Sequence, residues 1–183
     1  WRERQGLQRD TKWDDIIHKI VPLVEQDSIY LAGMNITKVD SSYLNKCRSD
    51  HPAVLGACGM LPASPLYNQE TMNKTYDWVM KNWNFMTTWG WDYGMIAMAA
   101  ARLGRPADAV NALMIDTQKN RYLPNGHNYQ DDRLRIYLPG NGALLEAVAM
   151  MCAGWDGSPN IKNPGFPQDG TWNVRWEGLR KMQ

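Results

Sequence analysis

The pattern of apolar and polar positions divides the chain into nearly all-apolar stretches that alternate with amphipathic and polar ones. From Gly94 to Ala101 no polar side chain occurs. A helix that is apolar on every side is buried between other elements, so this stretch predicts an inner helix. A hydroxyl at Thr87 or Thr88 can cap its first turn, so we expect the helix to begin near Trp89.

The first turn of this inner helix differs from the rest of it. Trp89, Trp91 and Tyr93 there surround the carboxylate of Asp92. Across the chain nine tryptophans and eight tyrosines stand against two phenylalanines, and such side chains combine a flat apolar face with a polar group. We expect a packed stem with a polar, aromatic mouth that suits a ligand with CH-rich faces and hydroxyls, such as a sugar. The alternative for each Trp is packing in a Trp-rich core.

The remaining elements follow from hydrophobic period and from Gly and Pro. Apolar residues at three- and four-residue steps predict a helix at residues 2–26, which Pro22 would kink or end. The rest of the pattern predicts a loop at 27–50 with a strand at 28–32, a short helix at 51–61, helices at 68–84 and 107–116, a loop at 116–139 with a strand at 134–138, an apolar helix at 141–153, and a Gly- and Pro-rich tail with a strand at 171–176.

An amphipathic helix, a polar or aromatic loop and an apolar helix with small residues recur along the chain. This order is typical of helical hairpins laid side by side, with outer helices shielding inner ones. About six helices make about three hairpins, and a closed α/α toroid has about twice that number. We therefore expect an all-α fold, about half of an (α/α)6 toroid over residues 1–170, with a β-like tail at 171–183. Residues outside this sequence or another chain would cover its open edges.

Charge and cysteine content narrow the class of protein. The formal charge of +1, without runs of like charge, gives no footprint for nucleic acid, and no apolar run is long enough for a membrane span. Cys47, Cys58 and Cys152 are odd in number and lack CxxC spacing, which supports neither a disulfide framework nor a zinc site. We expect no metal and no cofactor. We expect a periplasmic or secreted protein whose signal peptide is not part of this sequence, which opens without methionine.

Five segments together resemble the C-terminal half of a six-hairpin glycosidase. They are HPAVLGACGMLP from His51, TWGWDYGMIAMAAARLGRPADAVNAL from Thr88, YLPNGHNYQ from Tyr122, YLPGNGALLEAVAMM from Tyr137 and GTWNVRWEGLRKM from Gly170. From about Lys12 onward the chain is similar to the catalytic domain of glycoside hydrolase family 95, the inverting α-L-fucosidases, and more distantly to family 65. The resemblance implies a bacterial protein of carbohydrate metabolism that acts in polysaccharide degradation.

The resemblance also carries over to single residues. Gly140 and Asn141 match the family's catalytic Asp-Gly-Asn-Phe-Gly motif, but Pro139 stands where the family has its aspartate, and proline accepts no proton. A histidine-bearing loop of the family resembles the segment around His127. His51 is what remains here of a His-rich family segment. The resemblance places the family's general acid upstream of the first residue of this sequence.

Inverting glycoside hydrolysis needs a carboxylic acid and a carboxylate base about 6.5–9.5 Å apart. Asp92 is the predicted catalytic carboxylate, because burial between Trp91 and Tyr93 would raise its pKa. The alternative is a first-turn acid that only favours the helix dipole. Asp131 and Asp132 in the second loop are candidates for the lost base, and plain solvation is their alternative.

Six residues are predicted to bind the substrate. Aromatic stacking is expected from Trp89 and Trp91, and polar contacts are expected from four side chains, His51, His127, Asn128 and Asn141. For His127 the alternative is a histidine that satisfies loop backbone. The Pro-Gly-Asn-Gly segment that contains Asn141 could instead cap its helix, or hold an anion at the helix N-terminus as in a phosphorolytic relative.

The sequence thus predicts a carbohydrate-active domain, the C-terminal portion of a glycoside hydrolase that cleaves glycosidic bonds by general acid/base catalysis, with a saccharide as its partner. The alternative is a non-catalytic carbohydrate-binding or scaffold domain of the same fold that has lost the catalytic pair. A helical protein-interaction domain is a third possibility, for which a concave face poorer in Trp and Asn is expected.

Overall fold

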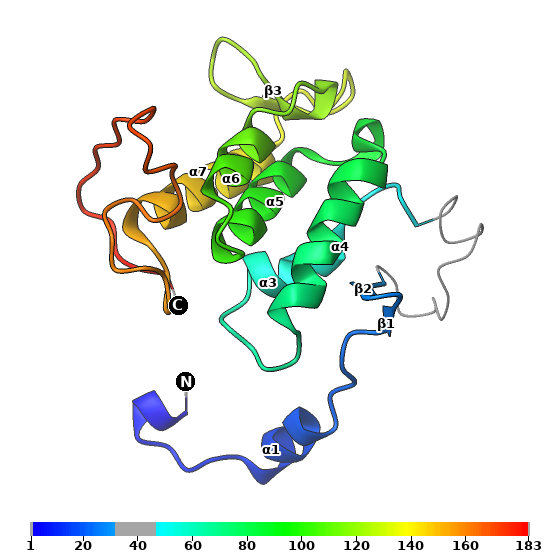
Figure 1. Cartoon of the computed structure of the whole chain (residues 1–183), viewed down its shortest axis with the longest axis vertical. Coiled ribbons are helices and arrows are strands. Elements are labelled where there is room, and N and C mark those ends of the chain that lie inside the picture. Colours follow the sequence, from blue (N-terminus) through cyan, green and yellow to red (C-terminus); the bar gives the residue numbers. More distant parts are fainter. Residues whose placement is uncertain (1, 32–46, 183) are drawn as a thin grey trace.

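The computed structural model describes residues 2–31 and 47–182 and is mostly helical, with two small hairpins (Figure 1). The α-helices are α1 (Thr11–His18), α3 (Gly56–Gly59), α4 (Gln69–Asn82), α5 (Gly90–Arg102), α6 (Pro106–Leu113) and α7 (Leu138–Ala153). The strands are β1 (Glu25–Gln26), β2 (Ile29–Tyr30), β3 (Arg121–Tyr122) and β4 (Asn128–Tyr129), and four 3-10 turns are η1 (Glu3–Gln5), η2 (Ala53–Leu55), η3 (Phe85–Thr87) and η4 (Gln118–Asn120).

Helix α5 is the central element, which confirms the prediction of an inner helix. It packs against α3, α6 and α7, and its residues from Asp92 to Ala101 are buried. Small residues allow these close approaches. A Cβ placed on Gly94 would lie 2.4 Å from the carbonyl oxygen of Ala143 in α7, and one on Gly59 would lie 2.7 Å from that of Met95. The apolar helices therefore pack almost backbone to backbone.

Helix α4 is amphipathic and covers one side of this core. The side chain of Asn68 caps it by accepting from the N–H groups of Glu70 (2.8 Å) and Thr71 (3.1 Å). Its apolar stripe is buried and includes Met72, Tyr76 and Val79. The helix also contacts β2, where the backbone N–H of Tyr30 donates to Thr75 Oγ1 at 2.8 Å.

Both hairpins are antiparallel and short. In the first, Glu25 pairs with Tyr30, so a strand forms inside the predicted segment 28–32. In the second, Arg121 pairs with Tyr129, within the long segment that joins α6 to α7. Residues 32–46, most of the loop predicted at 27–50, lie outside the described residues.

The prediction of one helix over residues 2–26 is wrong. Only Thr11–His18 forms an α-helix, and none of its residues is buried. Its apolar stripe faces solvent, with Trp13 61% and Ile17 56% exposed. The apolar stripe that predicted the helix is present, but no other element of the described structure packs against it. Figure 1 shows this blue segment below the helical body.

Two predicted strands are also wrong. The strand predicted at 134–138 is absent, because Leu138 is already the first residue of α7 and Pro139 fits the first turn of a helix. The segment 171–176 is irregular. In the described part of the tail, the β-like character is limited to one parallel bridge between Trp155 and Met182. Val174 and Met182 also pack against the core.

Candidate functional site

The candidate site begins at the N-terminus of α5. The N-cap is Trp89 rather than the predicted Thr87 or Thr88. The Thr88 hydroxyl instead donates to the carbonyl of Phe85 at 2.7 Å. An indole has no acceptor with which to cap the backbone N–H groups of the first turn. Instead, the side chain of Asp92 reaches back, and its Oδ2 accepts from the backbone N–H of Trp89 at 2.7 Å.

Asp92 is completely buried, and its carboxylate is held from two sides. Besides Trp89, the ring of His51 contacts it, with Nδ1 at 3.0 Å from Oδ2 and 3.1 Å from Oδ1. Burial raises the pKa of Asp92 from its ordinary value of 3.8 to about 6, while the bonds from Trp89 and His51 act in the opposite direction. The expected effect of burial is therefore present, but the carboxylate does not reach the surface. In this structure Asp92 is therefore separated from solvent by the residues around it, and its catalytic role stays a prediction.

The imidazole of His51 is the part of this pair that reaches solvent, with its side chain 30% exposed. It lies beside the indole of Trp91, with ring centroids 4.7 Å apart at 36°, and near that of Trp89, at 6.0 Å. Its Nε2 faces the exposed carboxylate of Asp50 at 3.4 Å. The structure therefore brings together four of the predicted residues, His51 and Asp92 with the half-buried indoles of Trp89 and Trp91 beside the imidazole.

Sequence reasoning missed two contributors to this cluster. Tyr137 precedes α7, and its ring lies 5.5 Å from that of Trp89. Burial, and the nearby charge of Asp92, raise the pKa of the Tyr137 phenol. The sequence offered one indication of Asp50, its position next to His51. The indication of Tyr137 was weaker, a tyrosine in the loop before Pro139.

Asn128, which is predicted to bind substrate, has a structural role in this structure. It is completely buried, and its Nδ2 donates to the carbonyl oxygens of Lys119 and Arg121, both at 3.1 Å. Its Oδ1 lies where a Cβ on Gly90 or Gly140 would be, so both glycines are needed for its approach. With both ends of the amide enclosed, Asn128 fixes the loop between α6 and α7 and presents nothing to a ligand.

Asn141 and His127 lie at the same end of the helices as Asn128. Asn141 Oδ1 accepts from the backbone N–H of Asn128 at 2.9 Å, and its Nδ2 donates to the carbonyl of Gly126 at 2.7 Å. His127 is half-buried, and among the described residues its Nδ1 has no hydrogen-bond partner. Asn141 thus holds the turn that carries His127, and no contact joins His127 to the ring of His51.

Gln130, which carried no sequence signal, ties this loop to the start of α5. It is completely buried. Its Oε1 accepts from the N–H of Gly90 at 2.9 Å and its Nε2 donates to the carbonyl of Thr88 at 3.3 Å. The side-chain amide thereby pairs with the backbone on both sides of Trp89 and fixes its position. The two loop acids have partners within the loop region: Asp132 accepts from the Tyr129 hydroxyl at 2.8 Å, and Asp131 accepts from the backbone N–H of Leu134 at 2.8 Å.

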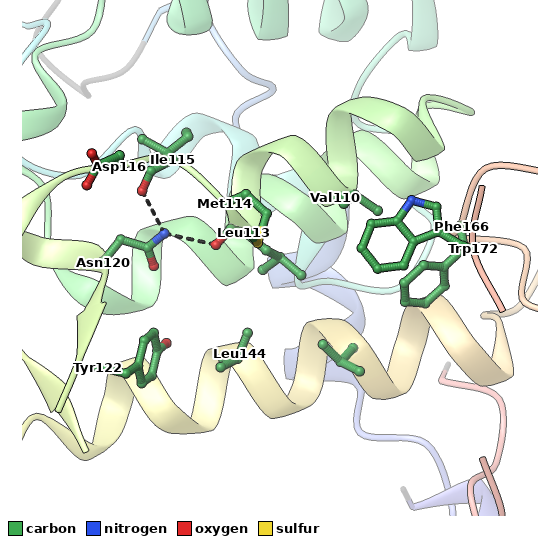
Figure 2. Close-up of a pocket in the computed structure, with 11 residues that line it drawn as sticks. Val110, Leu113, Met114, Ile115, Asp116, Asn120, Tyr122, Leu144, Phe166 and Trp172 are labelled. Carbon is green, nitrogen blue, oxygen red and sulfur yellow. Dashed lines mark hydrogen bonds between the residues drawn. The ribbon is translucent and has the colours of Figure 1, made fainter. Parts of the chain in front are cut away.

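A cavity of about 580 Å³ lies away from these residues, between α6, α7 and the tail (Figure 2). Its walls are mainly apolar and include Leu113, Met114, Leu144, Val148, Phe166 and Trp172. At its edge, Asn120 Nδ2 donates to the carbonyls of Leu113 and Ile115 at 2.9 and 3.0 Å. None of the seven predicted site residues lines this cavity. The cluster at the start of α5 is thus separate from it.

Further observations bear on cofactors and on the class of protein. Within residues 2–31 and 47–182, no helix combines the length and hydropathy of a membrane span, and no group of three or more His, Cys, Asp or Glu side chains is arranged to hold a metal ion. Cys47, Cys58 and Cys152 are free thiols. Comparison of the chain with models of protein families, with curated proteins and with solved structures finds no match.

Proposed function

We propose that the chain is a carbohydrate-active domain, a portion of a bacterial, periplasmic or secreted glycoside hydrolase that binds a saccharide at the start of α5. The observation that carries this proposal is the cluster of His51 and Asp92 between the indoles of Trp89 and Trp91. Half-buried indole faces stack on the CH-rich faces of sugar rings, and a dyad beside them supplies groups for hydroxyls and for proton transfer.

The arrangement of the helices supports the proposed fold of this domain, a partial α/α toroid. Inner helix α5 contacts α3, α6 and α7, and all three carry small apolar residues, while α4 is amphipathic. A buried helix surrounded by neighbouring helices is what adjacent hairpins of such a fold would produce. In a toroid the starts of α5 and α7 would border one central hollow, which residues outside this sequence or a second chain would complete.

The second candidate is a non-catalytic carbohydrate-binding or scaffold domain. Two observations favour it. Asp92 is completely buried, and both its oxygens are occupied by contacts within the protein. Among the predicted polar contacts, Asn128 is enclosed as well. Such a domain would retain the ring-lined surface and bind saccharides without cleaving them.

The test combines binding and turnover on a panel of saccharides and aryl glycosides. Saturation-transfer NMR identifies which saccharides bind, and release of nitrophenol measures cleavage. Truncating Trp91 to Ala should weaken binding about fivefold or more, because a stacked ring is worth about 1 kcal/mol beyond its buried area. The matched control is Trp172→Ala, since Trp172 is 47% exposed and lies at the separate cavity.

Turnover that depends on the cluster supports the enzyme, and binding without turnover supports the second candidate. Binding of no saccharide, or equal losses in the Trp91 and Trp172 variants, would exclude both candidates at this site.

A further inference from the structure

We propose that His51 is the proton-accepting group of this site, acting through Nε2, and that Asp92 is a positioning residue that fixes the imidazole tautomer. This inference rests on the proposed function for its natural substrate, but the geometry of the pair stands without it. It reverses the roles expected from the sequence, in which Asp92 was the catalytic group and His51 a binding residue.

The first step of the argument is access. Asp92 is completely buried, whereas the His51 side chain is 30% exposed. A proton can therefore reach the pair from bound substrate or water only through the imidazole. The indoles of Trp89 and Trp91 lie close to that ring, with centroids 6.0 and 4.7 Å from its own.

The second step is the tautomer. An ionised carboxylate only accepts hydrogen bonds, and both ring nitrogens of His51 face one. Asp92 lies 3.0 Å from Nδ1, closer than the exposed Asp50 lies to Nε2 at 3.4 Å, so we place the hydrogen of the neutral ring on Nδ1. In the neutral ring the lone pair is then on Nε2. The N–H of Trp89 holds the other side of the carboxylate at 2.7 Å, so Asp92 is oriented before any ligand arrives. A base held by a buried carboxylate in this manner is the arrangement that general-base catalysis requires.

The third step concerns the charged product. When Nε2 accepts a proton, the new N–H faces the carboxylate of Asp50, whose Oδ1 lies 3.4 Å from Nε2. The imidazolium is then flanked by Asp50 on the solvent side and by Asp92 on the buried side. The phenols of Tyr93 and Tyr137 are two further titratable groups that interact with the charge of Asp92. An acidic side chain therefore lies at each ring nitrogen of the charged product.

With an aryl glycoside, hydrolysis needs no catalytic group besides His51. Nε2 takes one proton from a water molecule while the water oxygen bonds to the anomeric carbon. The bond from that carbon to the aryl oxygen breaks, and the electron pair leaves on the phenolate. The products are the free sugar, the phenolate and the imidazolium, which returns its proton to solvent.

The first test measures the tautomer without any substrate. Long-range ¹H–¹⁵N NMR of the chain should show neutral His51 with hydrogen on Nδ1. In Asp92→Asn the backbone of Trp89 occupies the amide oxygen, so the amide N–H₂ faces the ring and the hydrogen should move to Nε2. His18→Gln assigns the spectrum by removing an exposed histidine of α1. A wild-type ring with hydrogen on Nε2 would overturn the inference.

The second test measures the base with a probe that is independent of sugars, p-nitrophenyl acetate. In that reaction Nε2 bonds to the acetyl carbon, nitrophenolate leaves, and water hydrolyses the acetyl-imidazole to acetate. We expect the rate at pH 7.5 to fall at least tenfold in His51→Gln and in Asp92→Asn, and to be unchanged in His18→Gln. Equal rates for wild type and His51→Gln would overturn the inference.

Glycoside turnover then separates the two proposals. If ester hydrolysis depends on His51 but no saccharide binds and none is cleaved, the proposed function is wrong and the assignment of His51 as a base stands. If glycosides are cleaved equally well by wild type and His51→Gln, the carbohydrate function remains and the role of His51 fails. For a general base, the loss of glycoside turnover in His51→Gln is expected to be about 100-fold or more.

Discussion

At the scale of single residues, the chemistry at the start of α5 depends on a carboxylate that is shielded from solvent. Asp92 has two donors, the N–H of Trp89 and Nδ1 of His51, yet burial dominates and raises its pKa to about 6. The sequence predicted this direction from the neighbouring aromatics. It could not predict the partner, because His51 is 41 residues away and only the folded chain brings the two together.

The raised pKa of Asp92 predicts a dependence of stability on pH. The folded state binds this proton more tightly than the unfolded state, so between about pH 4 and pH 6 the free energy of unfolding should fall as pH rises. Integrating a shift from 3.8 to about 6 gives a contribution of about 3 kcal/mol for this buried group, present below pH 4 and lost above pH 6. Urea titrations at a series of pH values measure it.

Asp92→Asn is the control, because the amide does not titrate. The difference in unfolding free energy between wild type and Asp92→Asn should shift in favour of the variant as pH rises from 4 to 6. A difference that is constant over this range would show that the carboxyl keeps its ordinary pKa in the folded protein.

A second prediction at this scale concerns Gly90. A Cβ there would lie 1.9 Å from Asn128 Oδ1, and Asn128 cannot retreat because Lys119 and Arg121 hold its amide. We expect Gly90→Ala to lower the free energy of unfolding by about 3 kcal/mol. Gly142 in α7 is the matched control: nothing lies within 4 Å of its added Cβ, so Gly142→Ala should be neutral or stabilise by up to about 1 kcal/mol. Equal effects in urea denaturation would contradict the close approach at Gly90.

At the scale of elements, the helices that pack on one another were the predictable part. Helices α4, α5, α6 and α7 lie where period, caps and Pro placed them, with boundaries that differ by a few residues. Their patterns were sufficient because burial of an apolar face decides the conformation. The wrong predictions are the helix at 2–26 and the strands at 134–138 and 171–176. In these segments the apolar pattern was short or had no other element to pack against. Local propensity alone does not hold such segments in a regular structure.

The link between the loop and α5 was not predictable, since a glutamine in a loop has no distinctive pattern. Gln130 bonds the backbone at Gly90 and Thr88, so its removal should leave two buried polar groups without this partner. We expect Gln130→Met to cost about 2–4 kcal/mol of unfolding free energy. Gln69→Met should change it by less than about 0.5 kcal/mol, because Gln69 is exposed and has one bond of 3.3 Å, to Arg102. Chemical denaturation measures the unfolding free energy of both variants. Equal losses would show that Gln130 does not hold the loop to α5.

At the scale of the whole molecule, the described chain consists of a helical body and an N-terminal segment with little support. The core extends from Tyr30 to Phe166. Residues before it are mostly exposed, including Val21 at 80%, and Leu23 is the first side chain that packs partly against the core. The ion pairs of α1, such as Lys19 with Asp15 at 2.8 Å, lie in solvent, where such pairs contribute little.

This difference predicts the order of proteolysis. An eight-residue helix without buried contacts is marginal in water, so the segment around Lys19 should open far more often than the buried helices, and trypsin should cut there before it cuts Arg102. Mass spectrometry should find a product that begins at Ile20 while Arg102 in buried α5 remains uncut. Because Leu23 stays with the body, that product should unfold within about 0.5 kcal/mol of the intact chain. A first cut inside the body, or a loss above about 2 kcal/mol on removal of α1, would mean that the exposed stripe of Trp13 and Ile17 packs on the body in solution.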